Sequence, residues 1–209
     1  MKKTLTILLI LFAKEFQAQV YSWVATAKVK YEGSGTGAFS AWDLELDRNG
    51  NSYVTGALTG TAYSGYDTIY GGAGPNNHQS YTSKISKTGQ VVWAKRTYGH
   101  KSYGIGVDYD GNCYTAGSIQ GGNMFVEKLD SLGNSLWTLD LQSNSTIWDY
   151  VTDLVTDSAG NSYVTGYFFN TISIGTYTLN NTGSSFGNVF LTKINTNGNV
   201  LWAKQIGGI

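Results

Sequence analysis

The chain has 209 residues, of which 13% are charged, 41% are hydrophobic and 27 are glycines. Fourteen Lys and Arg side chains balance fourteen Asp and Glu, so the chain lacks the positive charge expected of a nucleic-acid-binding protein. Its one cysteine, Cys113, excludes an intramolecular disulfide and a cysteine-based metal cluster. The hydrophobic share is large enough to bury a core, which argues against disorder.

Residues 1–18 have the layout of a secretory signal peptide. Two lysines precede the apolar stretch from Leu5 to Ala13, and the small residue Ala18 makes cleavage before Gln19 plausible. The apolar stretch is about half of the ~20 residues that span a bilayer, so we expect no membrane span. A buried N-terminal strand or helix is the alternative. The remaining residues, 19–209, are then expected to form one secreted repeat domain.

Two sequence blocks recur three times in the same order, which indicates a repeat protein. The first block has the pattern Asp-x-x-Gly-Asn-x-Tyr, and its copies begin at Asp47, Asp108 and Asp157. The second block starts at a lysine, passes a glycine and ends at a tryptophan, and its copies span 84–93, 128–137 and 193–202. The predicted repeats cover about 40–98, 99–142 and 147–209.

Each repeat predicts four short strands. The first strand ends at the Asp, the second carries Tyr, Val and Thr as in Ser52–Gly56, the third has an aromatic residue before the Lys, and the fourth carries the Trp. Glycines between the strands supply the positive φ that tight hairpins need. No segment of 19–209 keeps a helical period for long. The predicted fold is therefore all-β, with four-stranded antiparallel units repeated around an axis as the blades of a β-propeller.

The repeated residues are expected to be structural. The Asp side chains could be read as calcium ligands, but the copies at 47 and 157 lack the second carboxylate of such a loop, so we expect each Asp to cap its turn. The repeated tryptophans are expected to pack between neighbouring blades. The predicted structural set is Asp47, Gly50, Asn51, Asp108, Gly111, Asn112, Asp157, Gly160, Asn161, Trp93, Trp137 and Trp202.

The order Asp-x-x-Gly-Asn-x-Tyr-Val-Thr-Gly, then Phe-x-x-Lys, then Gly-Asn-x-Leu-Trp-Ala-Lys resembles the seven-bladed β-propeller (SBBP) repeat of secreted bacterial proteins. The resemblance covers about 42–209. Where that family often has Asp before the third-strand aromatic, this chain has Asn123 and Asn188 near Phe125 and Phe190. The resemblance implies a propeller architecture and export, and it implies no shared activity.

The predicted strands do not add up to a closed ring. Ser22–Ala27 looks like an additional fourth strand, so the sequence predicts three blades plus one N-terminal strand. Closed propellers have about four to eight blades. We therefore expect an incomplete propeller whose parent chain holds further repeats.

Aromatic residues that are not repeated are the candidates for ligand binding. They lie in or beside the two long connections between second and third strands, where loops on a rigid scaffold often bind ligands. An extra hairpin in each connection is the alternative. The candidate residues, expected to contact an extracellular glycan or protein, are Tyr63, Tyr66, Tyr70, Tyr167 and Tyr177.

The sequence offers little support for catalysis. Neither His78 nor His100 stands in a metal-binding or catalytic spacing, and no nucleophile motif occurs. The repeated lysines, Lys84, Lys128 and Lys193, are interpreted as solvated strand positions. The predicted function is a secreted, non-catalytic scaffold or recognition module without a cofactor or a bound metal. A fragment of a propeller enzyme acting on extracellular polysaccharide and a structural spacer are the alternatives.

Overall fold

The computed structural model describes residues 28–30, 39–64, 67–72, 77–145, 149–181 and 187–207, and within these ranges every regular element is a β-strand. The predicted signal peptide and the predicted strand Ser22–Ala27 lie outside the described residues.

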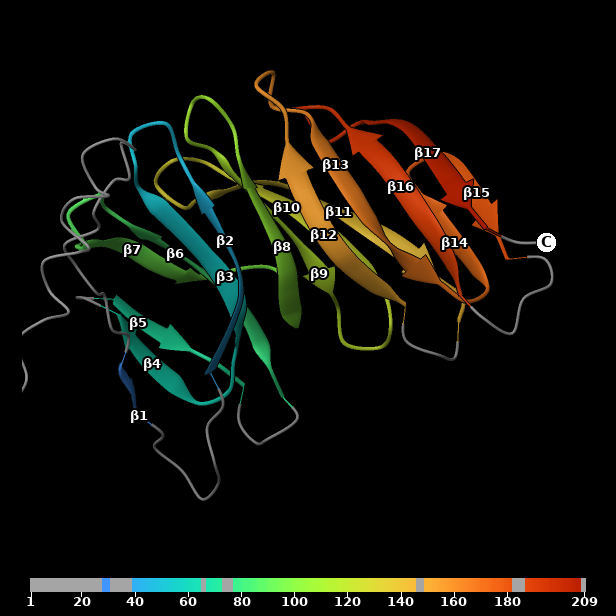
Figure 1. Cartoon of the computed structure of the whole chain (residues 1–209). Coiled ribbons are helices and arrows are strands. Elements are labelled where there is room, and N and C mark those ends of the chain that lie inside the picture. Colours follow the sequence, from blue (N-terminus) through green and yellow to red (C-terminus); the bar gives the residue numbers. More distant parts are fainter. Residues whose placement is uncertain are drawn as a thin grey trace, which may run out of the picture.

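The three repeats form three antiparallel sheets that lie side by side in chain order (Figure 1). The first sheet contains β2 (Phe39–Leu46), β3 (Ser52–Leu58), β6 (Gln79–Ile85) and β7 (Val91–Arg96). The second is built on β8 (Lys101–Val107), β9 (Cys113–Ser118), β10 (Met124–Leu129) and β11 (Ser135–Ser143). The third contains β12 (Tyr150–Thr156), β13 (Ser162–Phe168), β16 (Asn188–Ile194) and β17 (Val200–Ile206). The prediction of an all-β chain with antiparallel four-stranded units is confirmed, and the described sheets stand in an open row.

Each long connection between the second and third strands of a repeat contains a hairpin. The third repeat inserts β14 (Thr171–Ile174) and β15 (Tyr177–Asn180), and β14 pairs with the outer strand β11 of the preceding sheet. The first repeat inserts β4 (Thr61–Ser64) and β5 (Asp67–Tyr70), and β4 pairs with β1 (Lys28–Lys30). The second sheet therefore has six strands, two of which come from the next repeat.

The Asp-x-x-Gly turns are fixed by their own side chains. Oδ1 of Asp47 accepts hydrogen bonds from the backbone N–H groups of Asn49 and Asn51, each at 2.9 Å, and Oδ2 accepts one from the Asn51 amide at 2.7 Å. Gly50 has φ of +79°, a conformation that suits glycine. Burial alone would raise the pKa of Asp47, but these hydrogen bonds and the charge of Lys84 outweigh burial and hold the pKa below its usual value. The carboxylates of Asp108 and Asp157 accept the same bonds in their turns.

Repeated aromatic side chains connect each sheet to the next. The hydroxyl of Tyr53 donates to the carbonyl of Gly111 at 3.1 Å, and that of Tyr114 donates to the carbonyl of Gly160 at 2.9 Å. The indole N–H groups make parallel contacts: Trp93 donates to the Ser131 carbonyl at 3.1 Å, and Trp137 donates to the Thr196 carbonyl at 3.0 Å. The same residue types therefore build both joints between sheets.

The interpretation of the repeated lysines as solvated is wrong for Lys128, which is 6% exposed. Its ammonium group donates to the carbonyl and hydroxyl oxygens of Thr196 in the third sheet. The same group lies 4.9 Å from the Tyr114 ring centroid and 3.8 Å from the Asp108 carboxylate. A buried cation requires such partners, because without them the loss of hydration would be too costly.

The two equivalent tryptophans Trp137 and Trp202 provide a test of the joints. Trp137→Phe removes the hydrogen bond to the Thr196 carbonyl of the third sheet. Among the described residues, the Trp202 indole has no equivalent acceptor in another sheet. We expect Trp137→Phe to lower the free energy of unfolding by at least about 1 kcal/mol more than Trp202→Phe, since only Trp137 loses a hydrogen bond to another sheet. Urea denaturation measures the difference, and equal losses would contradict the assigned joint.

Candidate functional site

The first strands of the three repeats form one continuous face. β2, β8 and β12 are neighbours in space, and the carboxylate of Asp43 on β2 accepts the backbone N–H of Ile105 on β8 at 2.8 Å. A Cβ at Gly104 would lie 2.6 Å from the Leu154 nitrogen, so the absence of a side chain lets β8 approach β12 closely. Glycine at this position therefore lets β8 lie close to β12, and Figure 1 shows β2, β8 and β12 side by side.

Each of these strands has a β-bulge against its partner. The register shifts between Ala41 and Asp43 in the first repeat, between Ser102 and Gly104 in the second, and between Val151 and Asp153 in the third. A bulge adds one residue to the strand and re-aims its side chain. The extra residues are Trp42, Tyr103 and Thr152, so aromatic rings occupy this position in two of the three repeats.

Five aromatic rings make an unbroken series across this face. Successive ring centroids lie 5.0 Å apart from Trp42 to Tyr103, 6.2 Å from Tyr103 to Tyr150, 5.2 Å from Tyr150 to Tyr167 and 5.8 Å from Tyr167 to Phe169. We call these five residues the aromatic row. Trp42 is 41% exposed, and the other four are partly exposed. The row crosses all three repeats but is not part of the repeated pattern.

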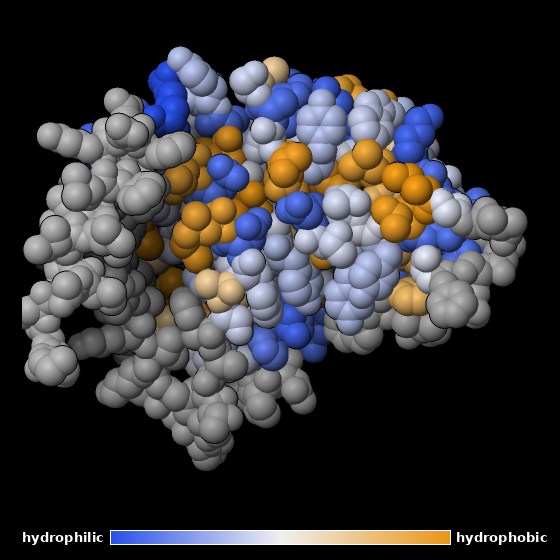
Figure 2. All heavy atoms as spheres, viewed as in Figure 1, coloured by the Kyte–Doolittle hydropathy of each residue, from blue (hydrophilic) through white to orange (hydrophobic). Residues whose placement is uncertain are grey.

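The row lies beside exposed apolar side chains. Figure 2, in the same view, shows a band of apolar side chains across the face, with paler, ring-shaped side chains next to it. Leu44 and Leu46 of β2 and Val155 of β12 are among the exposed apolar residues of these strands. Contiguous apolar surface of this kind on a folded protein often marks an interaction site.

A buried carboxylate holds Phe169, the last residue of the aromatic row, in place. Asp149 is fully buried and accepts the backbone N–H of Phe169 at 3.0 Å, which holds Phe169 against Tyr167. Burial raises the pKa of this carboxyl group, and it raises the pKa values of Tyr103 and Tyr167 as well. Tyr103 and Tyr167 are therefore neutral at physiological pH.

The structure separates the aromatic residues that the sequence suggested as ligand contacts. Tyr167 belongs to the row, whereas the Tyr177 hydroxyl donates to the Leu201 carbonyl at 2.8 Å and Tyr70 stands 67% exposed on β5 of another sheet. The side chains of Tyr63 and Tyr66 lie outside the described residues.

The sequence reasoning missed Trp42, Tyr103 and Tyr150, because it looked for unrepeated aromatics in loops. A signal was present, since Trp42 and Tyr103 occupy equivalent places ahead of the first repeated block. That comparison requires knowing where the bulge falls, and alternation along a regular strand does not reveal it.

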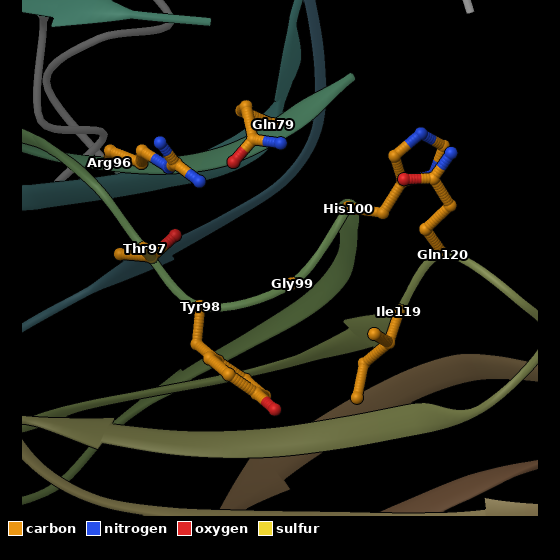
Figure 3. A pocket seen from close by; sticks show the side chains of 8 residues that line it. All are labelled: Gln79, Arg96, Thr97, Tyr98, Gly99, His100, Ile119 and Gln120. Carbon is orange, nitrogen blue, oxygen red and sulfur yellow. The ribbon is translucent and has the colours of Figure 1, made fainter. Parts of the chain in front are cut away.

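A hollow of about 440 Å³ is lined by residues of the first and second sheets and the connections beside them. Figure 3 shows its lining: the side chains of Gln79 and Arg96 point toward one another, and those of His100 and Gln120 overlap in this view. The two histidines meet at this rim, with ring centroids 5.2 Å apart and the backbone N–H of His78 donating to Nε2 of His100 at 3.2 Å. The remaining lining residues are Thr97, Tyr98, Gly99 and Ile119.

The three repeated Asp turns meet at the opposite end of the strands. Asp47, Asp108 and Asp157 line a smaller hollow of about 180 Å³, where the Arg48 guanidinium stacks on the Tyr109 ring at 3.8 Å. Their carboxylates are occupied by the turn hydrogen bonds described above. In the described ranges, no three His, Cys, Asp or Glu side chains group closely enough to hold a metal ion. Nor do those ranges contain a helix that is long and apolar enough to cross a bilayer.

Comparison with known proteins adds no identification. No family model matches the chain, and no curated protein matches it.

Proposed function

We propose that this chain is a secreted, non-catalytic recognition module of the bacterial SBBP type, and that its aromatic row binds an extracellular polysaccharide. Three repeated sheets, side by side and joined by the same Tyr and Trp contacts, support the interpretation of these sheets as successive propeller blades. The layout of residues 1–18 supports export.

The observation that carries the proposal is the aromatic row. Residues that recur in every repeat are used for packing, whereas Trp42, Tyr103, Tyr150, Tyr167 and Phe169 break the pattern and yet form one series. Tyrosine and tryptophan combine an apolar ring face with a polar edge. A sugar ring has the complementary chemistry, with C–H groups on its faces and hydroxyls around its rim.

The shape of the row favours a polymer over a small ligand. The rings are distributed over β2, β8, β12 and the end of β13, so they form an extended surface and do not enclose a compact pocket. Their positions are set by strands and by contacts with one another, which reduces the entropy lost on binding. A chain of sugar units could contact several rings at once.

Affinity electrophoresis tests the proposal, with native gels that contain one polysaccharide each from a panel of neutral, carboxylated and sulfated polymers. At least one polymer is expected to retard the protein, and Trp42→Ala and Tyr103→Ala are each expected to weaken that binding by about tenfold. Tyr109→Ala is the matched control, because Tyr109 is 60% exposed at the opposite end of the strands. Circular dichroism checks that each variant is folded.

Two outcomes would contradict the proposal that the aromatic row is the binding site. Retardation that Trp42→Ala and Tyr103→Ala leave unchanged would place binding elsewhere, and an equal loss in Tyr109→Ala would indicate non-specific adsorption. Absence of retardation by every polymer in the panel would favour a spacer role for the repeats.

A further inference from the structure

The described residues that line the hollow between the first and second sheets include hydrogen-bond donors but no Asp or Glu. Among the described residues that line it, Arg96 carries the one formal charge, and the amide of Gln120 adds a further donor group. The amide nitrogen of Gln79 donates one hydrogen bond to the His78 carbonyl at 2.9 Å and has a second N–H. Figure 3 shows these groups around the hollow. Guanidinium and amide groups together suit an oxyanion, because a carboxylate or sulfate accepts several hydrogen bonds at once.

Two carboxyl groups lie near the hollow, and both accept hydrogen bonds from Tyr98. The backbone N–H of Tyr98 donates to Glu127 at 2.8 Å, and its hydroxyl donates to Asp140 at 3.3 Å. Glu127 is buried, and burial raises its pKa. Neither carboxyl group belongs to the lining. Arg96 is therefore the one formally charged side chain among the described residues that line the hollow.

The loop that forms the hollow is held in place before any ligand binds. The Tyr98 ring packs edge-on against Phe125 with centroids 5.5 Å apart, and a Cβ at Gly99 would collide with the same Phe125 ring. The Thr97 hydroxyl lies 3.1 Å from that of Ser80, and the Thr97 backbone N–H donates to the Ser80 carbonyl at 3.0 Å. Such preorganisation favours specific recognition over adaptable contact.

Two neighbouring strands, β8 and β9, connect the lining of the hollow to Tyr103 of the aromatic row. His100 of the lining directly precedes β8, which carries Tyr103 of the row. Ser118 ends β9 opposite Lys101 of β8, and Ile119 and Gln120 of the lining follow it. Tyr103 therefore lies close in the fold to residues that line the hollow.

We infer that the hollow binds the anionic substituent, a carboxylate or a sulfate ester, of the polysaccharide that lies on the aromatic row. The inference rests on the proposed function and narrows it: the ligand is an acidic polysaccharide. Arg96 would pair with the anion through its guanidinium group, and Gln79 and Gln120 would donate to the remaining oxygens.

Pairs of polymers with the same backbone test the inference. Polygalacturonate is compared with its methyl-esterified form, and carrageenan with its chemically desulfated form, by affinity electrophoresis of the full chain. We expect the acidic member of one pair to bind about tenfold more tightly than its neutral form, and we expect Arg96→Gln to abolish that preference. The pair that shows the preference distinguishes a carboxylate from a sulfate.

Arg48→Gln is the matched control, since it removes the same charge at the opposite end of the strands. Equal binding of the acidic and neutral forms by the unchanged protein would overturn the inference and leave the proposed function standing. An equal loss in Arg48→Gln and Arg96→Gln would also overturn it, because it would reveal attraction by net charge alone. If no polymer of either kind binds, the proposed function fails as well.

Discussion

Replacing Gly117 with alanine is expected to lower the free energy of unfolding by more than about 3 kcal/mol. Gly117 on β9 faces the bulge of β8, and a Cβ there would lie 1.8 Å from the carbonyl oxygen of Lys101. That atom belongs to the backbone of an inner strand that packs against β12, so it cannot move without disturbing the joint between sheets. Urea denaturation followed by tryptophan fluorescence measures the loss.

Gly121→Ala is the control for the loss of a glycine. Gly121 has φ of +102°, but a Cβ there would meet no atom within 4 Å. Alanine at this position is expected to cost about 1 kcal/mol through backbone strain alone. If Gly117→Ala fails to fold while Gly121→Ala folds, the result supports the steric clash between a Cβ at position 117 and the Lys101 carbonyl. Equal unfolding midpoints would show that the bulge is not packed as described.

The second large effect is expected at Lys128. Lys128→Ala removes the two contacts with Thr196, the ion pair with Asp108 and the cation from the Tyr114 ring, and it leaves the Asp108 carboxylate buried without its cation. Breaking a buried pair on one side is costly, so we expect a loss of about 3 kcal/mol in the free energy of unfolding.

Lys193 is the matched control for Lys128. It occupies the same place in the third repeat, with its ammonium group 3.6 Å from Asp157 and 4.7 Å from the Tyr163 ring. Among the described residues, no hydrogen bond from another sheet reaches this ammonium group. Lys193 is more exposed than Lys128, so Lys193→Ala is expected to cost much less. Equal losses for the two variants would mean that the contact with Thr196 adds nothing to the joint.

The strand content and strand order could be predicted because they depend on local chemistry. Gly50, Gly111 and Gly160 have φ between 76° and 79°, and a tight hairpin turn needs that conformation at this position. Each such turn lies between strands whose alternation is visible in the sequence, so the four strands of each repeat followed directly.

The candidate site could not be predicted, because it depends on contacts between repeats. Trp42 and Tyr103 are far apart in sequence, and they meet because each stands at a β-bulge and because β2 packs beside β8 in the fold. The burial of Lys128 is hidden for the same reason, since its partner Thr196 belongs to the next repeat. Patterns within one repeat contain no information about such neighbours.

The hairpin β14–β15 determines how the chain can be divided. Its residues belong to the third repeat by sequence, yet β14 completes the second sheet through Leu141, Gln142 and Ser143 of β11. Dividing the chain between the second and third repeats would leave β11 of the second sheet as an unpaired edge strand. It would also leave the β14–β15 hairpin of the third repeat without the strand it pairs with. A shuffled or shortened version of this protein would therefore keep its solubility only if each module were transferred together with the hairpin of its successor.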